Sequence, residues 1–182
     1  MSLPENAAMK RSFASLSPQE ALHVAIFIEE RNAELYHRFA EMFVEFRDGD
    51  SSKIAGVFWE MAAEERDHSS RLQAKYMERF GTSGCSLTEE DLVDLIEVPR
   101  LEQVDLFAAP DAPNKVSARD RALQVALNAE RSAQQYYASL VGNTEPGPLR
   151  QLYRELADME DGHVAAIAQK MSTYPAKDAG KK

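Results

Sequence analysis

The sequence has 182 residues, 44% of them hydrophobic and 28% charged, which is typical of a globular protein with one domain. Its net charge of −9 repels a phosphate backbone, and no apolar run approaches a membrane span, so we expect neither nucleic acid nor a membrane as partner. The single cysteine, Cys85, excludes a disulfide framework and a Cys-x-x-Cys motif within these residues. The N-terminal stretch has no apolar signal-peptide core, and the expected compartment is the cytoplasm.

Helical spacing of apolar residues is the main pattern of the sequence. No segment shows the alternation of apolar and polar residues that is typical of a strand. A capping box at Ser17 and Glu20 opens the first helix, Asp50 or Ser51 is the predicted cap of the second, and Gly81 ends the second. Flexible tails are expected before and after a single domain at residues 17–172, at 1–16 and 173–182. The predicted helices cover about 17–46, 51–80, 88–97, 117–141 and 149–171.

The lengths of the connections predict how these helices are arranged. Short turns follow the first helix and the third long helix, so each joins an antiparallel pair. The long connection over residues 81–116 can carry the chain across one end of the bundle or along its length, and it contains the short helix. One long crossover is typical of the ferritin-like arrangement. The predicted fold is therefore an all-α, ferritin-like four-helix bundle with a short extra helix in the crossover.

Two Glu-x-x-His motifs, one in each predicted helix pair, point to the chemistry. Glu65 and His68 form the first motif, and Glu160 and His163 form the second. Positions i and i+3 share one face of a helix, and both motifs occupy places where the apolar spacing requires core residues. A buried carboxylate is unfavourable by several kcal/mol unless it is paired or neutralised. Two copies in register favour a dinuclear metal site over buried Glu–His hydrogen bonds in a metal-free bundle.

The other two long helices each offer a glutamate as a further ligand. On the third long helix Glu130 lies among apolar residues and is the only acid in the middle of the helix. On the first helix Glu29 and Glu30 are adjacent and both are candidates. The local match between Glu30-Arg-Asn-Ala and Glu130-Arg-Ser-Ala favours Glu30, whereas the apolar stripe favours Glu29. The spacing to a following tyrosine also favours Glu29, which is the preferred ligand.

Tyr36 and Tyr137 stand seven residues after Glu29 and Glu130 and are the candidate catalytic residues. A phenol at this position can donate to a ligating carboxylate or to a bound oxygen species, or it can be an ordinary core tyrosine. The acids beside the motifs are interpreted as solvated neighbours. They are Glu64, Asp67, Asp158 and Asp161.

Four carboxylates and two imidazoles without a thiolate suit iron best and manganese second. The expected cofactor is two iron ions per chain, with manganese as the alternative. No haem is expected, because we interpret the methionines as residues that fill gaps in the core and not as haem ligands.

The order Glu, Glu-x-x-His, Glu, Glu-x-x-His over about residues 17–171 resembles the ferritin-like superfamily, specifically rubrerythrin-like diiron proteins. The resemblance implies reduction of the ions by a donor and oxidation by dioxygen or peroxide. There is no cysteine-rich rubredoxin domain here, so a separate electron donor protein is expected. Ala133 stands where rubrerythrins have an extra glutamate, and the second Glu-x-x-His is more similar to bacterioferritin. The implied ligands are Glu29, Glu65, Glu130 and Glu160 as carboxylates and His68 and His163 as terminal imidazoles.

The function expected from this resemblance is a nonhaem diiron oxidoreductase of the peroxidase or ferroxidase type, active in oxidative-stress defence. The alternatives are an iron-handling protein without fast turnover and a diiron hydroxylase on the same scaffold. About ten residues follow the last predicted helix, so a homodimer is expected rather than a ferritin cage.

Overall fold

A computed structural model describes residues 15–45, 49–95 and 118–173. Nearly all of both predicted tails, and the part of the crossover at 96–117, lie outside these residues. The described residues form helices and no strand, as predicted for the ferritin-like fold. The helices are α1 (Pro18–Val44), α2 (Gly49–Phe80), α3 (Glu89–Leu95), α4 (Ala118–Asn143) and α5 (Pro148–Thr173).

The predicted helix ends are correct to within two residues where they can be compared. At the start of α1 the Ser17 hydroxyl accepts from the Glu20 N–H at 3.2 Å, and the Glu20 carboxylate accepts from the Ser17 N–H at 2.8 Å. Gly81 follows α2 with a φ of 60°, a left-handed conformation that glycine adopts without strain. The predicted cap of α2 is wrong, because the helix begins at Gly49 and places Asp50 and Ser51 in its first turn.

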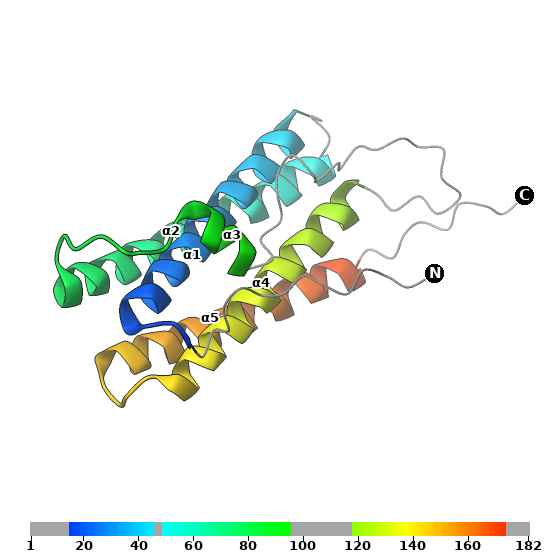
Figure 1. Cartoon of the computed structure of the whole chain (residues 1–182). Coiled ribbons are helices and arrows are strands. Elements are labelled where there is room, and N and C mark those ends of the chain that lie inside the picture. The colour runs from blue at the N-terminus through cyan, green and yellow to red at the C-terminus, as the bar shows by residue number, and fades with distance from the viewer. Residues whose placement is uncertain (1–14, 46–48, 96–117, 174–182) are drawn as a thin grey trace, which may run out of the picture.

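The helices pack as two antiparallel pairs, α1 with α2 and α4 with α5 (Figure 1). α2 and α4 run in the same direction, so the chain has to return along the length of the bundle between them (Figure 1). This is the long crossover that the sequence predicted, and α3 lies on it. Leu92 and Leu95 anchor α3 to the bundle through buried side chains. None of the described helices has an apolar stretch long enough to cross a membrane.

The core has two apolar clusters, one toward each end of the bundle. Leu22, Leu72 and Leu156 are fully buried in the first cluster, and Phe58 and Leu123 are fully buried in the second. The four long helices place a layer of acidic residues in the sequence interval between the two clusters. All four of these acids are 0% exposed: Glu29, Glu65, Glu130 and Glu160. The fold therefore encloses a polar layer that apolar packing cannot satisfy.

Candidate metal centre

The polar layer brings together six side chains, which are the six residues predicted as metal ligands. They form two overlapping groups, and within each group the potential ligand atoms lie within 4.8 Å of one another. We name each group after its histidine. The His68 half-site contains Glu29, Glu65, His68 and Glu160. The His163 half-site contains Glu65, Glu130, Glu160 and His163.

Glu65 and Glu160 belong to both half-sites, whereas each of the other four residues belongs to one. A shared carboxylate has two oxygens and can therefore contact a cation on either side. If two cations were bound, Glu65 and Glu160 could hold both of them, and each cation would have one further carboxylate and one imidazole.

The structure separates the two candidates on the first helix. Glu29 is 0% exposed and lies in the His68 half-site. Glu30 is exposed, and its carboxylate accepts a hydrogen bond from the Gln73 side chain at 2.8 Å. The preference for Glu29 from the apolar stripe agrees with this placement. The local match that favoured Glu30 failed because adjacent residues of a helix point about 100° apart.

Both histidines present the Nδ1 nitrogen to the carboxylates. The Nδ1 of His68 lies 3.1 Å from Glu29 Oε2 and 3.5 Å from one oxygen each of Glu65 and Glu160. The Nδ1 of His163 lies 3.4 Å from one oxygen each of Glu65, Glu130 and Glu160. The two rings stack with their centroids 5.9 Å apart, so the half-sites face each other across the shared carboxylates.

Tyr36 and Tyr137 cross between the two halves of the bundle. The Tyr36 hydroxyl donates to Glu130 Oε1 at 2.5 Å, and the Tyr137 hydroxyl donates to Glu29 Oε1. Each tyrosine thus orients the glutamate of the opposite half, rather than the one seven residues before it. Burial and the facing carboxylates raise the pKa of both phenols well above the usual value, so both remain proton donors.

The charge of this layer is balanced by protons when no cation is present. Burial raises the pKa of Glu65 well above its ordinary value and that of Glu130 to about 8. Burial alone would raise the pKa of Glu160, but the adjacent Glu130, His163 and His68 side chains lower it. Burial would lower the pKa of His68, yet hydrogen bonds to carboxylates raise it to about 12. The carboxylates raise the pKa of His163 in the same way.

The unpaired atoms of the layer show that its residues fit a pair of cations. Neither oxygen of Glu65 nor of Glu160 has a hydrogen-bond partner among the described residues, although both side chains are fully buried. Buried polar atoms without partners are rare, and they are unfavourable unless an ion or a water satisfies them. Oxygen and imidazole donors without thiolate match iron or manganese. The shared glutamates are therefore where the structure most needs a cation.

Sequence reasoning missed the cross-helix role of Glu64. Its carboxylate lies 2.9 Å from the Nε2 of His163, on the side of the ring that faces away from the half-site. Glu64 is 55% exposed, so its interpretation as a solvated residue was correct in part. The pair joins α2 to α5, and no spacing within either helix could have revealed it.

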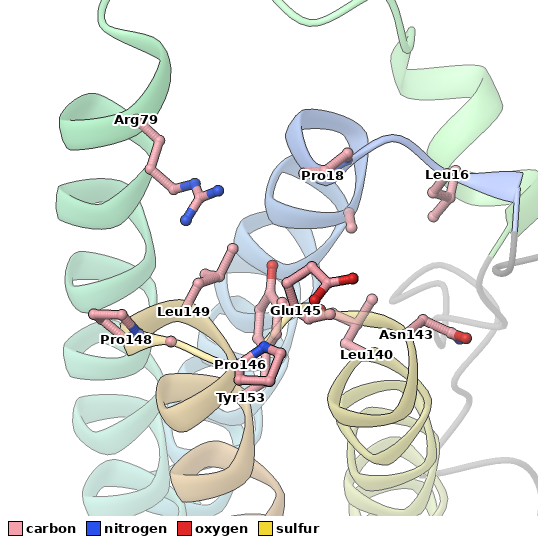
Figure 2. Close-up of a pocket in the computed structure, with 13 residues that line it drawn as sticks. Leu16, Pro18, Arg79, Leu140, Asn143, Glu145, Pro146, Pro148, Leu149 and Tyr153 are labelled. Atoms are coloured by element: carbon pink, nitrogen blue, oxygen red, sulfur yellow. The ribbon is translucent and has the colours of Figure 1, made fainter.

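Tyr153 was also missed. It is 1% exposed, its hydroxyl has no hydrogen-bond partner among the described residues, and its ring stacks on Tyr137 with centroids 6.2 Å apart. Tyr153 and Arg79 line a cavity of about 370 Å³ at the end of the bundle, beside the turn that joins α4 to α5 (Figure 2). None of the six ligand candidates lines this cavity. It is therefore not the access tunnel that a hydroxylase would need.

The fold is an all-α, ferritin-like bundle, and the buried cluster is similar to the ligand layer expected of a rubrerythrin-like protein. A family model for rubrerythrin matches residues 20–102, which include most of α1 and all of α2 and α3. The resemblance predicted from the motifs is thereby confirmed over the first half of the bundle. No curated protein and no solved structure matches the chain. The second half of the site is supported by the buried cluster itself.

Proposed function

We propose that the protein is a nonhaem diiron oxidoreductase that reacts with peroxide or dioxygen. The observation that carries this proposal is the pair of shared, fully buried glutamates whose oxygens have no hydrogen-bond partner in the part of the chain that the structure describes. The proposal includes two iron ions per chain, with manganese as the alternative metal. Glu29, Glu65 and Glu160 would hold one ion with His68, and Glu65, Glu130 and Glu160 would hold the other with His163.

A bound iron pair supplies Lewis acidity and electrons for the reduction of an oxygen species. The residues of the chain hold that pair in place. Tyr36 and Tyr137 keep their protons and orient Glu130 and Glu29 through hydrogen bonds. Apolar clusters toward both ends of the bundle keep bulk water from the layer. In this proposal both tyrosines can also supply a proton or an electron.

Electrons are proposed to come from a separate donor protein, because one cysteine cannot form a four-cysteine iron site within these 182 residues. The proposed form of the protein is a homodimer. A second candidate function is iron binding and handling without fast turnover, which the net charge of −9 and the exposed acid beside His163 favour.

Two measurements test the proposal. Elemental analysis of protein purified without added metal is expected to give two metal ions per chain. Stopped-flow mixing of the di-ferrous protein with peroxide or dioxygen is expected to show rapid oxidation and repeated turnover with a reductant. Slow, stoichiometric oxidation without recycling would instead identify an iron-handling protein. A chain that binds no metal at all would remove both functions.

A further inference from the structure

The two half-sites differ in the support given to their histidines. The Nε2 of His163 lies 2.9 Å from the Glu64 carboxylate, which can only accept a hydrogen bond when it is ionised. A proton on Nε2 leaves the lone pair of the neutral ring on Nδ1, the nitrogen that faces the three carboxylates of this half-site. Once a cation has displaced the proton on Nδ1, Glu64 therefore keeps the remaining proton on Nε2 and holds His163 in the tautomer that binds a metal.

His68 has no such support. Its ring is fully buried, its Nδ1 also faces the carboxylates, and its Nε2 has no hydrogen-bond partner among the described residues. When the two Glu-x-x-His motifs are superposed in sequence, the residue that corresponds to Glu64 is Met159. A thioether is only a weak acceptor and carries no charge. The residue before the motif thus supplies an anion to one half-site and none to the other.

The residue three positions after each histidine also differs between the half-sites, being positively charged after His68 and neutral after His163. Arg71 follows His68 by three residues, whereas the corresponding residue after His163 is Ala166. The Arg71 guanidinium contacts the Met159 sulfur at 3.8 Å and pairs with Glu155 at 2.6 Å. A guanidinium therefore contacts Met159, the residue that corresponds in sequence to Glu64.

The two histidines also differ in how much of each side chain is exposed to solvent. The His163 side chain is 14% exposed and its partner Glu64 is 55% exposed, whereas His68 is 0% exposed. A cation that arrives from solvent can therefore reach the His163 half-site with less rearrangement of the bundle. Because Glu65 and Glu160 are common to both half-sites, they cannot make the two differ.

We propose that the half-sites bind divalent cations in a fixed order, the His163 half-site first and more tightly, with Glu64 as the positioning residue that sets the difference. This inference rests on the proposed function in that it requires a dinuclear site. Loss of a hydrogen-bond partner of a ligating histidine typically weakens metal binding about 10–100-fold. We therefore expect the affinity for the first ion to be at least about tenfold higher than that for the second.

The test is titration of the metal-free protein with Co²⁺, followed by calorimetry and by the visible absorption of the bound ion. The wild-type chain is expected to bind two ions in two resolved steps. In Glu64→Ala the first step weakens about tenfold and the second is unchanged. Glu60→Ala is the matched control, because Glu60 is an exposed acid one turn earlier on α2. It removes the same charge and is expected to leave both steps intact.

Removal of each histidine assigns the steps. His163→Ala is expected to abolish the tight step and His68→Ala the weak step. A gain of function is expected when Met159→Glu is combined with Arg71→Ala, since the new carboxylate can then accept from His68 and tighten the second step. Far-ultraviolet circular dichroism checks that each variant remains helical.

The outcomes separate this inference from the proposed function. Two Co²⁺ ions bound with equal affinity, or a Glu64→Ala variant that weakens both steps equally, would overturn the order of binding while the dinuclear site stands. Failure of the wild-type chain to bind Co²⁺ would overturn the dinuclear site itself.

Discussion

The two halves of the bundle, α1 with α2 and α4 with α5, contribute the same residue types to the polar layer. They differ in the residues near that layer. Each half supplies two glutamates, one histidine and one tyrosine to the layer. Residues at corresponding positions near these groups in sequence do not repeat: Glu64 corresponds to Met159, Phe58 to Tyr153, Arg71 to Ala166 and Asn32 to Ala133. A ligand set with twofold symmetry therefore does not make the two half-sites equivalent.

The largest effect should come from the residues that both half-sites share. Glu65→Ala and Glu160→Ala are each expected to lower the metal content from two ions per chain to below one, because each removes a ligand from both cations. Glu130→Ala removes a ligand from the His163 half-site alone and should retain about one ion. Elemental analysis of the purified variants measures this series.

Glu30→Ala provides the control, since Glu30 is exposed and adjacent to Glu29 in sequence. It should bind as much metal as the wild-type chain. If Glu30→Ala lost metal while Glu65→Ala kept two ions, the assignment of shared and unshared carboxylates would be wrong.

The next largest effect is the dependence of metal affinity on pH. Carboxylates raise the pKa of His68 to about 12, and burial raises that of Glu130 to about 8, so both hold protons at pH 6. A cation has to displace these protons, and its apparent affinity must therefore rise with pH. We expect a rise of about tenfold per pH unit for each proton displaced between pH 6 and pH 8.

Calorimetric titrations with Co²⁺ in buffers of different ionisation enthalpy count the released protons in each binding step. Both half-sites contain a histidine whose pKa is raised, so both steps should release protons. An affinity that is independent of pH would show that the donors are already deprotonated without metal.

Much of the fold and of the ligand set was predictable because it depends on local spacing. The capping box at Ser17, the break at Gly81 and the long crossover are all encoded in short segments or in connection lengths. The Glu-x-x-His motifs were visible because position i+3 returns to the same face of a helix. Glu29 was preferred to Glu30 because it shares a side with apolar residues, and the structure buries it.

The contacts between helices were not predictable, because nothing in one helix specifies what faces it from another. The sequence predicted that Tyr36 could donate to a ligating carboxylate, but it did not indicate that this carboxylate is Glu130 on α4. The pairing of Glu64 with His163 depends on how α2 and α5 are rotated against each other. These are the contacts that distinguish the two half-sites, so their inequivalence could be recognised only from the structure.

Two tyrosines that stack on each other offer a smaller and more local test of the comparison. Tyr137→Phe leaves the Glu29 oxygen without its donor and should lower the free energy of unfolding of the metal-free protein by about 1–3 kcal/mol. Tyr153→Phe removes a buried hydroxyl that has no partner among the described residues, and it creates the residue that the other half has in Phe58. It should be neutral or stabilising.

Urea unfolding of both metal-free variants measures the difference. Equal destabilisation by the two substitutions would mean that the Tyr153 hydroxyl has a partner in solution, such as a water in the cavity at the end of the bundle (Figure 2).

The smallest effect is expected from Arg71, which has no charged counterpart in the other half. Its ion pair with Glu155 is short at 2.6 Å, but the two side chains are 35% and 46% exposed, so water and salt screen the attraction. Arg71→Ala should therefore lower the free energy of unfolding by no more than about 1 kcal/mol, and by less in high salt. A loss well above this range that persists in high salt would show that Arg71 stabilises the buried acidic layer directly. In that case the guanidinium would act on the His68 half-site through the charge of the layer, and the contrast between the two half-sites would depend on Arg71 as much as on Glu64.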